Sequence, residues 1–450
     1  MISSQDSLAK PNVATGADAE RITIYHWMVV IIASAGWLFD CMDQRIFALA
    51  RQPAMREILG KGATDAAVTD LVGLATTIML IGWATGGIIF GIMSDRLGRV
   101  KTMAVTLLIY SGFTGLSGIA HSVTAFMTYR FLVGLGVGGM FGAATTLVAE
   151  SVPARVRSVA LGSLQALSAI GNIIGSLIST QIQPSKVEFL FGMTGWRILF
   201  FVGILPSILV VPTLFFLREP DKWKQAKARA KSGAEKAGSI PELFRHPTWR
   251  RNVLVGVGLG LAGMAGLWGV GFFSPELISI ALKGSPQNVV DTVRGYGLAM
   301  QDVGAFLGMI AFTVVATRFG RKPAFLLGFL ACLGVTIFVF NNLRSGSDAY
   351  WMLPLMGFAQ LSVFGGYAIY FPELFPTRLR GTGVGFCYNT VRYLAAGFPP
   401  LLGFFNRQLI ASGAAEPFRT AATILSFIFL LGLVALIWAP ETKGKPLPED

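Results

Sequence analysis

One charged pattern occurs twice in this chain. Residues 150–157 read ESVPARVR and residues 373–380 read ELFPTRLR, so both fit E-x-x-P-x-R-x-R, and the second copy begins close to half a chain length after the first. A second pair, RLGR at 96–99 and RFGR at 318–321, is separated by almost the same interval. Each copy sits on a short polar break between long apolar runs. We therefore expect a duplicated chain whose halves fold alike.

The composition places this duplicated chain in a membrane. Hydrophobic residues make up 53% and charged residues 14%, which is too apolar for a water-soluble globular protein. Apolar runs near the roughly 20 residues that cross a bilayer recur throughout. We predict an all-α membrane protein with twelve transmembrane helices in two pseudo-symmetric six-helix bundles. The predicted spans are 24–49, 69–93, 100–120, 123–149, 158–182, 196–217, 251–274, 293–317, 322–341, 350–372, 381–406 and 418–439.

Charge placement predicts the orientation. The net charge is +13, and most Lys and Arg fall on segments that face the cytoplasm if both termini do. That is the positive-inside asymmetry and not a nucleic-acid surface. We expect a multi-pass monomer in the cell membrane, with the lipid bilayer and no nucleic acid as partner. The predicted parts are a cytoplasmic tail 1–23, a bundle 24–217, a basic linker 218–250 that is partly helical around 222–237, a bundle 251–439 and a cytoplasmic tail 440–450.

Two further patterns have a structural interpretation. Cys41, Cys332 and Cys387 all fall in apolar segments, so the sequence predicts neither a disulfide framework nor a metal site, and no cofactor is expected. Residues 134–139 fit the dinucleotide pattern G-x-G-x-x-G, but no strand precedes them. Close helix packing through Gly134, Gly138 and Gly142 is the better interpretation.

The segment GIMSDRLGRVK at 91–101 joins the second and third spans with almost no loop. So tight a connection needs glycine, and Asp95 is expected at the start of the third span, where a carboxylate meets the positive end of the helix. The segment resembles the signature loop of the major facilitator superfamily, and the twelve spans with a basic central linker match that family along the whole chain. The resemblance implies two six-helix bundles that rock about a central cavity. In the second copy of the loop, Thr317 stands where an acidic residue often occurs.

Other motifs narrow the resemblance. The two E-x-x-P-x-R-x-R copies, Trp196-Arg197 and the PETKG at 440–444 are similar to the sugar porters and related metabolite–proton symporters. GWLFDCMD at 36–43 and YNTVR at 388–392 resemble proton-coupled carriers of organic anions such as sialate, aromatic acids, nicotinate and lactate.

Ionisable groups inside spans are costly and therefore mark functional candidates. The six in this chain are Asp40, Asp43, Arg45, Arg130, Asp302 and Arg392. Helix rise places Arg392 near the midplane, where a guanidinium suits bidentate recognition of a carboxylate. The predicted substrate-binding residues are Arg392, Asn389, Tyr388, Gln165, Arg130, Trp268 and Tyr367, with Phe364 beside them. The alternative for Arg392 is an ion pair that only locks the eleventh span.

Proton coupling requires a carboxylate whose affinity for a proton follows the conformational cycle. Asp40, Asp43 and Asp302 are the candidates, and we favour Asp302 and Asp40 with Arg130 and Arg392 as switching partners. A static Asp40–Arg130 bridge is the alternative, and sodium is an alternative coupling ion.

The repeated motifs predict a symmetric gate. Glu150 and Glu373 end the fourth and tenth spans at the inner face, and each is expected to latch to the signature loop of its own half. Solvated anchoring is the alternative. The predicted gating residues are Asp95, Arg96, Gly98, Arg99, Glu150, Arg155, Arg157, Arg318, Arg321, Glu373, Arg378 and Arg380.

These features predict a secondary active transporter that moves a small organic anion, either a monocarboxylate, an aromatic acid or a sugar acid, in symport with protons. A sugar or polyol porter is the alternative suggested by 440–444, and a drug exporter ranks third. The duplication argues against a channel or receptor. An enzyme is not expected, because H-E-x-x-H, G-x-S-x-G and a histidine near a buried carboxylate do not occur.

Overall fold

The computed structural model describes residues 22–60, 62–63, 65–182, 184, 192–231 and 238–449, and this part of the chain is almost entirely helical. The predicted N-terminal tail, apart from its last two residues, and residues 232–237 of the linker lie outside it. The first half contains α1 (Ile24–Leu59), α2 (Asp65–Leu97), α3 (Arg99–Ser117), α4 (Val123–Ser151), α5 (Ala154–Ile182), α6 (Gly195–Val202), the short 3-10 helix η2 (Leu205–Leu209) and α7 (Val210–Phe216). The linker contains α8 (Asp221–Lys231) and α9 (Ile240–Arg245).

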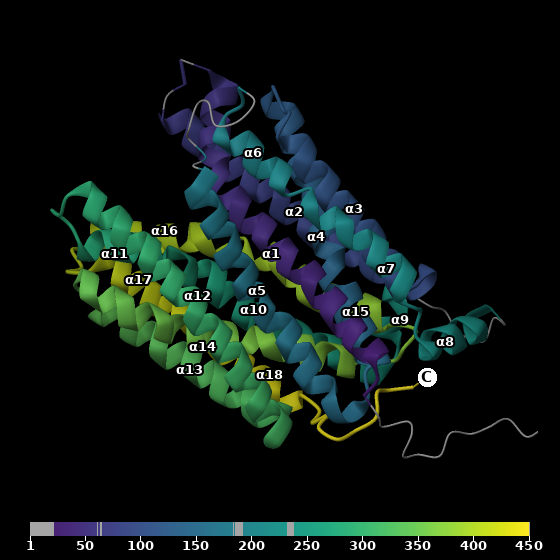
Figure 1. Cartoon of the computed structure of the whole chain (residues 1–450). Coiled ribbons are helices and arrows are strands. Elements are labelled where there is room, and N and C mark those ends of the chain that lie inside the picture. Colours follow the sequence, from purple (N-terminus) through teal and green to yellow (C-terminus); the bar gives the residue numbers. More distant parts are fainter. Residues whose placement is uncertain are drawn as a thin grey trace, which may run out of the picture.

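The second half contains α10 (Pro247–Gly269), η3 (Gly271–Phe273), α11 (Ser274–Ala281), α12 (Gln287–Arg318), α13 (Arg321–Asn342), α14 (Gly346–Glu373), α15 (Arg380–Ala395), α16 (Phe398–Ala411), α17 (Pro417–Ser426) and α18 (Phe429–Trp438). Figure 1 shows the two sets leaning against each other, the first in purple to teal and the second in green to yellow. The predicted fold of two six-helix bundles is confirmed.

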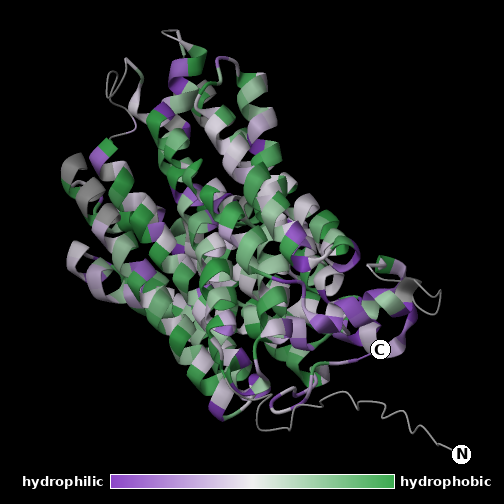
Figure 2. Ribbon diagram, turned by 45° about the vertical axis from the view of Figure 1, so that its right-hand side comes forward, coloured by the Kyte–Doolittle hydropathy of each residue, from purple (hydrophilic) through white to green (hydrophobic). Residues whose placement is uncertain are grey.

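The longer of these helices supply the twelve crossings of the fold. Ten helical stretches in the described residues are long and apolar enough to span a membrane, and α3 and the α15–α16 pair supply the other two. Figure 2 shows hydrophobic residues along most of the bundles, with hydrophilic residues gathered where the linker and the C-terminal segment lie. The apolar surface is the one expected to meet lipid.

Several boundaries differ from the sequence prediction. The first span ends at 49 in the prediction, but α1 continues to Leu59 with Pro53 inside the helix. The eleventh span was expected to be continuous, but α15 ends at Ala395 and α16 begins at Phe398. The reason is the proline pair 399–400 in the first turn of α16, because proline lacks the N–H that a continuing helix needs.

Glycines set the spacing of α2 and α4. A Cβ atom on Gly134 would lie 2.2 Å from the Met79 oxygen, and one on Gly138 would lie 2.0 Å from the Trp83 oxygen. These two helices therefore touch backbone to backbone, as the small-residue spacing predicts. This close packing fixes the position of Trp83, which belongs to the site described below.

The third membrane span of each half, α3 or α13, is capped at its N-terminus by a carboxylate. Glu219 accepts hydrogen bonds from the Arg99, Val100 and Lys101 N–H groups at 2.7, 3.0 and 3.2 Å. Glu441, the counterpart of Glu219 in the second half, accepts bonds from the first two N–H groups of α13, each at 3.0 Å. Both carboxylates satisfy free donors at the positive end of a helix.

The two carboxylates differ in their surroundings. Burial raises the pKa of Glu219 and outweighs the hydrogen bonds that lower it. Burial also acts to raise the pKa of Glu441, but backbone N–H donors outweigh it and lower the pKa overall.

Glycine is required at both capped ends. Gly98 and Gly320 precede α3 and α13 with φ of 123° and 114°. A Cβ on Gly98 would also lie 2.2 Å from a Glu219 carboxylate oxygen. These are the turns in the two copies of the signature loop, and only glycine accommodates both the dihedral angle and the close carboxylate.

An arginine caps the other end of the same helices. Arg197 donates to the carbonyls of Gly118 and Ala120 at 2.7 and 3.1 Å. Arg419, its counterpart in the second half, donates to the carbonyls of Phe340 and Leu343, the latter at 2.7 Å. Each of these helices thus has a carboxylate at its N-terminus and a guanidinium at its C-terminus, which matches the helix dipole.

Candidate functional site

Three of the predicted substrate-binding residues lie together on α15. Tyr388, Asn389 and Arg392 are buried and contact the first half of the chain. The Tyr388 ring stacks on Phe141 of α4, with ring centres 4.0 Å apart. Asn389 occupies the space above Gly87 of α2, where a Cβ would lie 1.9 Å from its Nδ2 atom. The site is therefore built at the interface of the two halves.

Arg392 is the central group of this cluster. Its guanidinium carbon lies 3.6 Å from the centre of the Trp83 ring and 4.9 Å from that of Tyr388. Its Nε and Nη1 atoms are buried without a hydrogen-bond partner, and the ion pairs among the described residues do not include it. Aromatic faces stabilise the positive charge, while the unpaired N–H groups leave hydrogen bonds to be made by an anion.

Asp40 of α1 is a carboxylate whose charge acts on this guanidinium. It is fully buried, and both of its carboxylate oxygens lack a hydrogen-bond partner among the described residues. The charges of Asp40 and Arg392 interact without forming an ion pair in contact. The sequence prediction that these two residues work together is thus compatible with the structure, and their role remains a proposal.

The remaining predicted substrate residues occupy different surroundings. Gln165 is buried on α5 and its Oε1 atom has no partner among the described residues, so its place at the site stays a prediction. The Tyr367 hydroxyl donates to the Leu259 carbonyl at 2.7 Å, and the ring packs against Phe364 at 5.3 Å. Trp268 is half-buried against the main core of the protein. The Tyr367 ring also lies edge-on to Tyr388, with ring centres 6.4 Å apart, and the roles of Tyr367, Phe364 and Trp268 in substrate binding stay predictions.

Arg130 lies in an aromatic pocket of the first half. It donates to the Ser117 hydroxyl at 2.6 Å and faces the rings of Phe200, Phe47 and Phe126 at 4.8, 5.3 and 5.7 Å. The carboxylate whose charge acts on it is Asp43 and not Asp40. Among the described residues the alternative of a static Asp40–Arg130 bridge is absent.

Asp302 has a partner that the sequence did not predict. Arg45 of α1 donates to Asp302 of α12 at 2.6 Å, with exposed side-chain fractions of 24% and 12%. The pairing differs from the expected one with Arg130 or Arg392. It joins the two halves of the chain, so it must break or rotate whenever they separate on this side.

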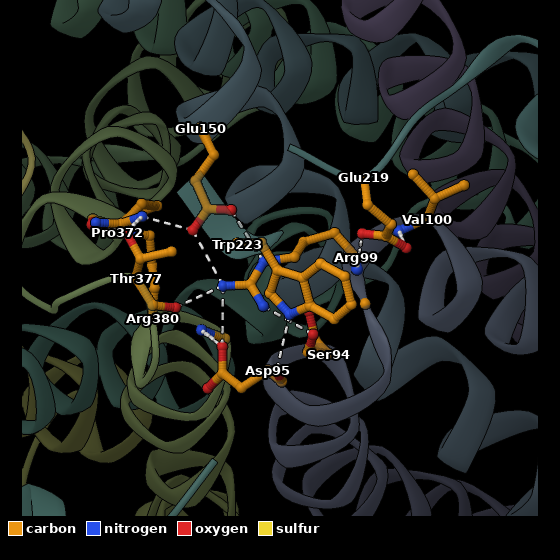
Figure 3. Close-up of polar contacts among 12 residues, drawn as sticks. Ser94, Asp95, Arg99, Val100, Glu150, Glu219, Trp223, Pro372, Thr377 and Arg380 are labelled. Atoms are coloured by element: carbon orange, nitrogen blue, oxygen red, sulfur yellow. Dashed lines mark hydrogen bonds and ion pairs between the residues drawn. The ribbon is translucent and has the colours of Figure 1, made fainter. Parts of the chain in front are cut away.

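The first copy of the signature loop forms a buried charge network (Figure 3). Arg99 binds Glu150 through two hydrogen bonds of 3.0 Å and lies 3.2 Å from Asp95. The same Glu150 oxygen that Arg99 Nη2 contacts also accepts a bond from Arg380 at 2.5 Å. Glu150 therefore latches to the loop of its own half and, in addition, to an arginine of the other half.

Asp95 also crosses to the other half. It accepts hydrogen bonds from the Gly381 N–H, the Thr382 N–H and the Thr382 hydroxyl at 2.9, 2.8 and 2.7 Å. These donors form the N-terminal turn of α15, where a carboxylate is favoured by the helix dipole. The expectation that Asp95 meets the positive end of the third span is therefore wrong, because Asp95 lies in α2 and Glu219 occupies the N-terminus of α3. Trp223 of α8 donates to the Asp95 carbonyl at 2.8 Å and covers Arg99. No sequence pattern predicted this contact with the linker.

The second copy repeats the latch in part. Arg321 binds Glu373 through hydrogen bonds of 3.0 and 2.7 Å and also contacts Ser158 of the first half. Thr442 adds a bond of 2.6 Å to Glu373. At Thr317, the position equivalent to Asp95, the hydroxyl bonds to its own helix at the Thr313 carbonyl. Within the described residues, the cross-half carboxylate latch is thus found on one side only.

The other predicted gating residues surround these two networks. Arg157 is buried within reach of the Glu373 charge. Arg378 pairs with Glu242 of α9 at 3.7 Å. Arg96, Arg155 and Arg318 are exposed at the same end of the molecule. Groups of His, Cys, Asp or Glu able to hold a metal are absent from the described residues.

The sequence of this chain matches known transport proteins. The family model described as Major Facilitator Superfamily matches residues 33–400. The cis,cis-muconate transport protein of Acinetobacter baylyi is 30% identical over 381 residues, covering 83% of this chain and 86% of that protein. The sialic acid transporter NanX of Escherichia coli is 30% identical over 327 residues, covering 72% and 76%.

A solved structure agrees with the fold. The proton:xylose symporter XylE bound to 6-bromo-6-deoxy-D-glucose superposes with a TM-score of 0.73 at 19% identity, covering 94% of this chain and 98% of that one. At this identity the likeness concerns the arrangement of helices.

Proposed function

The chain belongs to the Major Facilitator Superfamily of membrane transporters, and from this premise we propose that it carries a small organic acid across the cell membrane in symport with protons. The observation that supports the choice of an acid is Arg392. A buried guanidinium with unpaired N–H groups at the interface of two bundles is stabilised when a carboxylate binds there.

The aromatic walls favour a planar substrate. Trp83 lies under the guanidinium on one side, and Tyr388 with Phe141 forms a stack beside it. An unsaturated or aromatic acid presents a flat carbon skeleton next to its carboxylate, which suits such walls. The muconate and sialic acid relatives both carry organic acids by name, which supports the class without selecting one member.

A sugar porter is the second candidate, because the fold matches a xylose symporter. Neutral hydroxyls do not compensate a buried cation as a carboxylate does. We therefore rank an acid above a sugar.

Proton coupling is assigned to Asp302 and Asp40. Asp302 pairs with Arg45 across the halves, and Asp40 lies within electrostatic range of Arg392. A nearby cation stabilises the charged form of a carboxylate. When the halves move, or when substrate binds that cation, the carboxylate loses this stabilisation and binds a proton more tightly. This links protonation to both substrate binding and the conformational change.

The signature-loop network is proposed as the inner gate. Asp95 binds the N-terminal turn of α15, Arg99 donates to the Thr377 carbonyl just before that helix, and Glu150 binds Arg380 at its first position. With these contacts made, the halves are joined at the end that carries the linker. Alternating access then requires the network to open while the Arg45–Asp302 pair stays made, and the pair to break when the halves separate on its own side.

The test is uptake by the purified protein in proteoliposomes with an imposed proton gradient. Benzoate, nicotinate, cis,cis-muconate, sialate, xylose and glucose are offered as labelled substrates. The proposal predicts gradient-driven accumulation of at least one acid and none of the sugars. Accumulation of a sugar alone would support the porter alternative, and uptake that ignores the proton gradient would remove proton coupling.

A further inference from the structure

A groove of about 510 Å³ lies between α10 and α18, which pack against each other in the second half (Figure 1). Its walls include Leu254, Val434 and Trp438, whose side chains are 62%, 48% and 59% exposed. Large apolar side chains this exposed on two membrane spans face the acyl chains of the bilayer. The groove is separate from the interface where Arg392 lies.

The groove is polar at one end only. Arg250 and Arg251 are the fourth and fifth residues of α10, are both exposed, and line the end of the groove nearest the linker. Trp438, the last residue of α18, lines the groove as well. Tryptophan and arginine at span ends mark the level of the lipid headgroups.

The rest of the groove extends toward the middle of the membrane. Gly258, two helical turns beyond Arg250, still lines it, so the groove follows α10 for about 12 Å. A Cβ atom on Gly258 would lie 2.9 Å from the Ala435 Cβ atom, so this glycine lets α10 and α18 approach closely at the bottom of the groove. Two cations above an apolar trough of this length match a molecule with an anionic head and a hydrocarbon tail.

We propose that this groove binds one anionic phospholipid, with its phosphate on Arg250 and Arg251 and one acyl chain between α10 and α18. A zwitterionic lipid brings its own cation to the two arginines and is therefore disfavoured. A free phosphate would leave the apolar walls uncovered. This site is independent of the transport function proposed above.

The test uses native mass spectrometry of the purified full-length protein. Delipidated protein is incubated with dioleoyl phosphatidylglycerol or dioleoyl phosphatidylcholine, which share acyl chains and differ in headgroup charge. The variants are Arg250→Gln, Arg251→Gln and Val434→Phe, the last of which fills the groove without changing charge. Arg245→Gln, at the end of α9 and outside the groove, is the matched control.

The proposal predicts that phosphatidylglycerol is retained in preference to phosphatidylcholine and that each arginine variant weakens its binding roughly fivefold. Val434→Phe should weaken it as well, while Arg245→Gln should not. Equal retention of the two lipids, or wild-type retention in both arginine variants, would overturn the proposal. Displacement of the bound lipid by glycerol 1-phosphate alone would show a phosphate site and not a lipid site, and would also overturn it.

Discussion

The guanidinium of Arg392 on α15 lies 3.6 Å from the ring centre of Trp83 on α2, so the central cation of one half rests on an aromatic face of the other. Because the two residues belong to different halves, their separation depends on how the halves are placed. The contact therefore couples the environment of the proposed carboxylate-binding group to the conformational state.

Replacing Trp83 should weaken substrate binding more than turnover. Trp83→Leu removes the aromatic face under Arg392, which is worth about 0.5–2 kcal/mol. We expect KM for the transported acid to rise about 2- to 30-fold with a smaller change in kcat. Trp351→Leu, at an exposed tryptophan on α14, is the control and should leave KM unchanged. A fall in kcat at constant KM would contradict this role.

Glu150→Gln should open the inner gate. The substitution weakens buried ion pairs to both Arg99 and Arg380, and loss of one partner of a buried pair typically costs about 3–5 kcal/mol. A cysteine placed at Ser94, which is buried against Gly381 of the other half, reports the opening in a cysteine-free background. We expect faster labelling by a maleimide in Glu150→Gln.

Glu373→Gln supplies the matched comparison for this gate. Its ion pair with Arg321 joins residues of one half only. We expect a smaller gain in labelling at Ser94 than Glu150→Gln gives. Equal or opposite changes in the two variants would show that the cross-half bond to Arg380 does not hold the gate.

Asp302→Asn should separate exchange from accumulation. The neutral amide cannot pair with Arg45 as a charge or carry a proton through the cycle. We expect substrate counterflow between equal pH values to persist while accumulation driven by a proton gradient is lost. Asp221→Asn, at an exposed carboxylate in α8, should retain both activities. Full gradient-driven accumulation in Asp302→Asn would remove this residue from the coupling mechanism.

Gly98→Ala should destabilise the protein. Its φ of 123° is unfavourable for any residue with a Cβ, and that atom would meet the Glu219 carboxylate. Strain of this kind costs about 1–3 kcal/mol. We expect a lower midpoint of thermal unfolding than for Gly112→Ala, where a Cβ would have nothing within 4 Å. Equal midpoints would contradict the requirement for glycine at this turn.

Much of the fold follows from patterns that the chain repeats. The nearly constant interval between the paired motifs predicts two similar halves, and the same interval separates Glu219 from Glu441 and Arg197 from Arg419. The sequence places both pairs at equivalent positions: a basic residue at the start, and an acidic residue just after the end, of the sixth and twelfth spans. Their function as helix caps was not predicted, because a single charge at a span end is equally typical of a solvated anchor.

Residues of the candidate site could be predicted where a single residue or motif is unusual in the sequence by itself. Arg392 is unusual because a charged residue in an apolar span is energetically costly. Glu150 and Glu373 are recognisable because each begins a copy of the repeated E-x-x-P-x-R-x-R motif. Trp83 and Phe141 could not be recognised as site residues, since aromatic residues in a membrane span usually face lipid or pack in a core. The Arg45–Asp302 pair was missed because helix rise gives depth only, and which helices meet depends on the angle between the bundles.

The most direct test of the central claim is equilibrium binding of the acid that gives the highest uptake, measured by isothermal titration calorimetry on wild type and Arg392→Gln. The account predicts at least about a tenfold loss of affinity in the variant, because a charge-assisted hydrogen bond is lost at a buried site. Arg407→Gln, at an exposed arginine of α16, should bind as the wild type does. Unchanged affinity in a folded Arg392→Gln protein would contradict the claim that this guanidinium binds the substrate carboxylate.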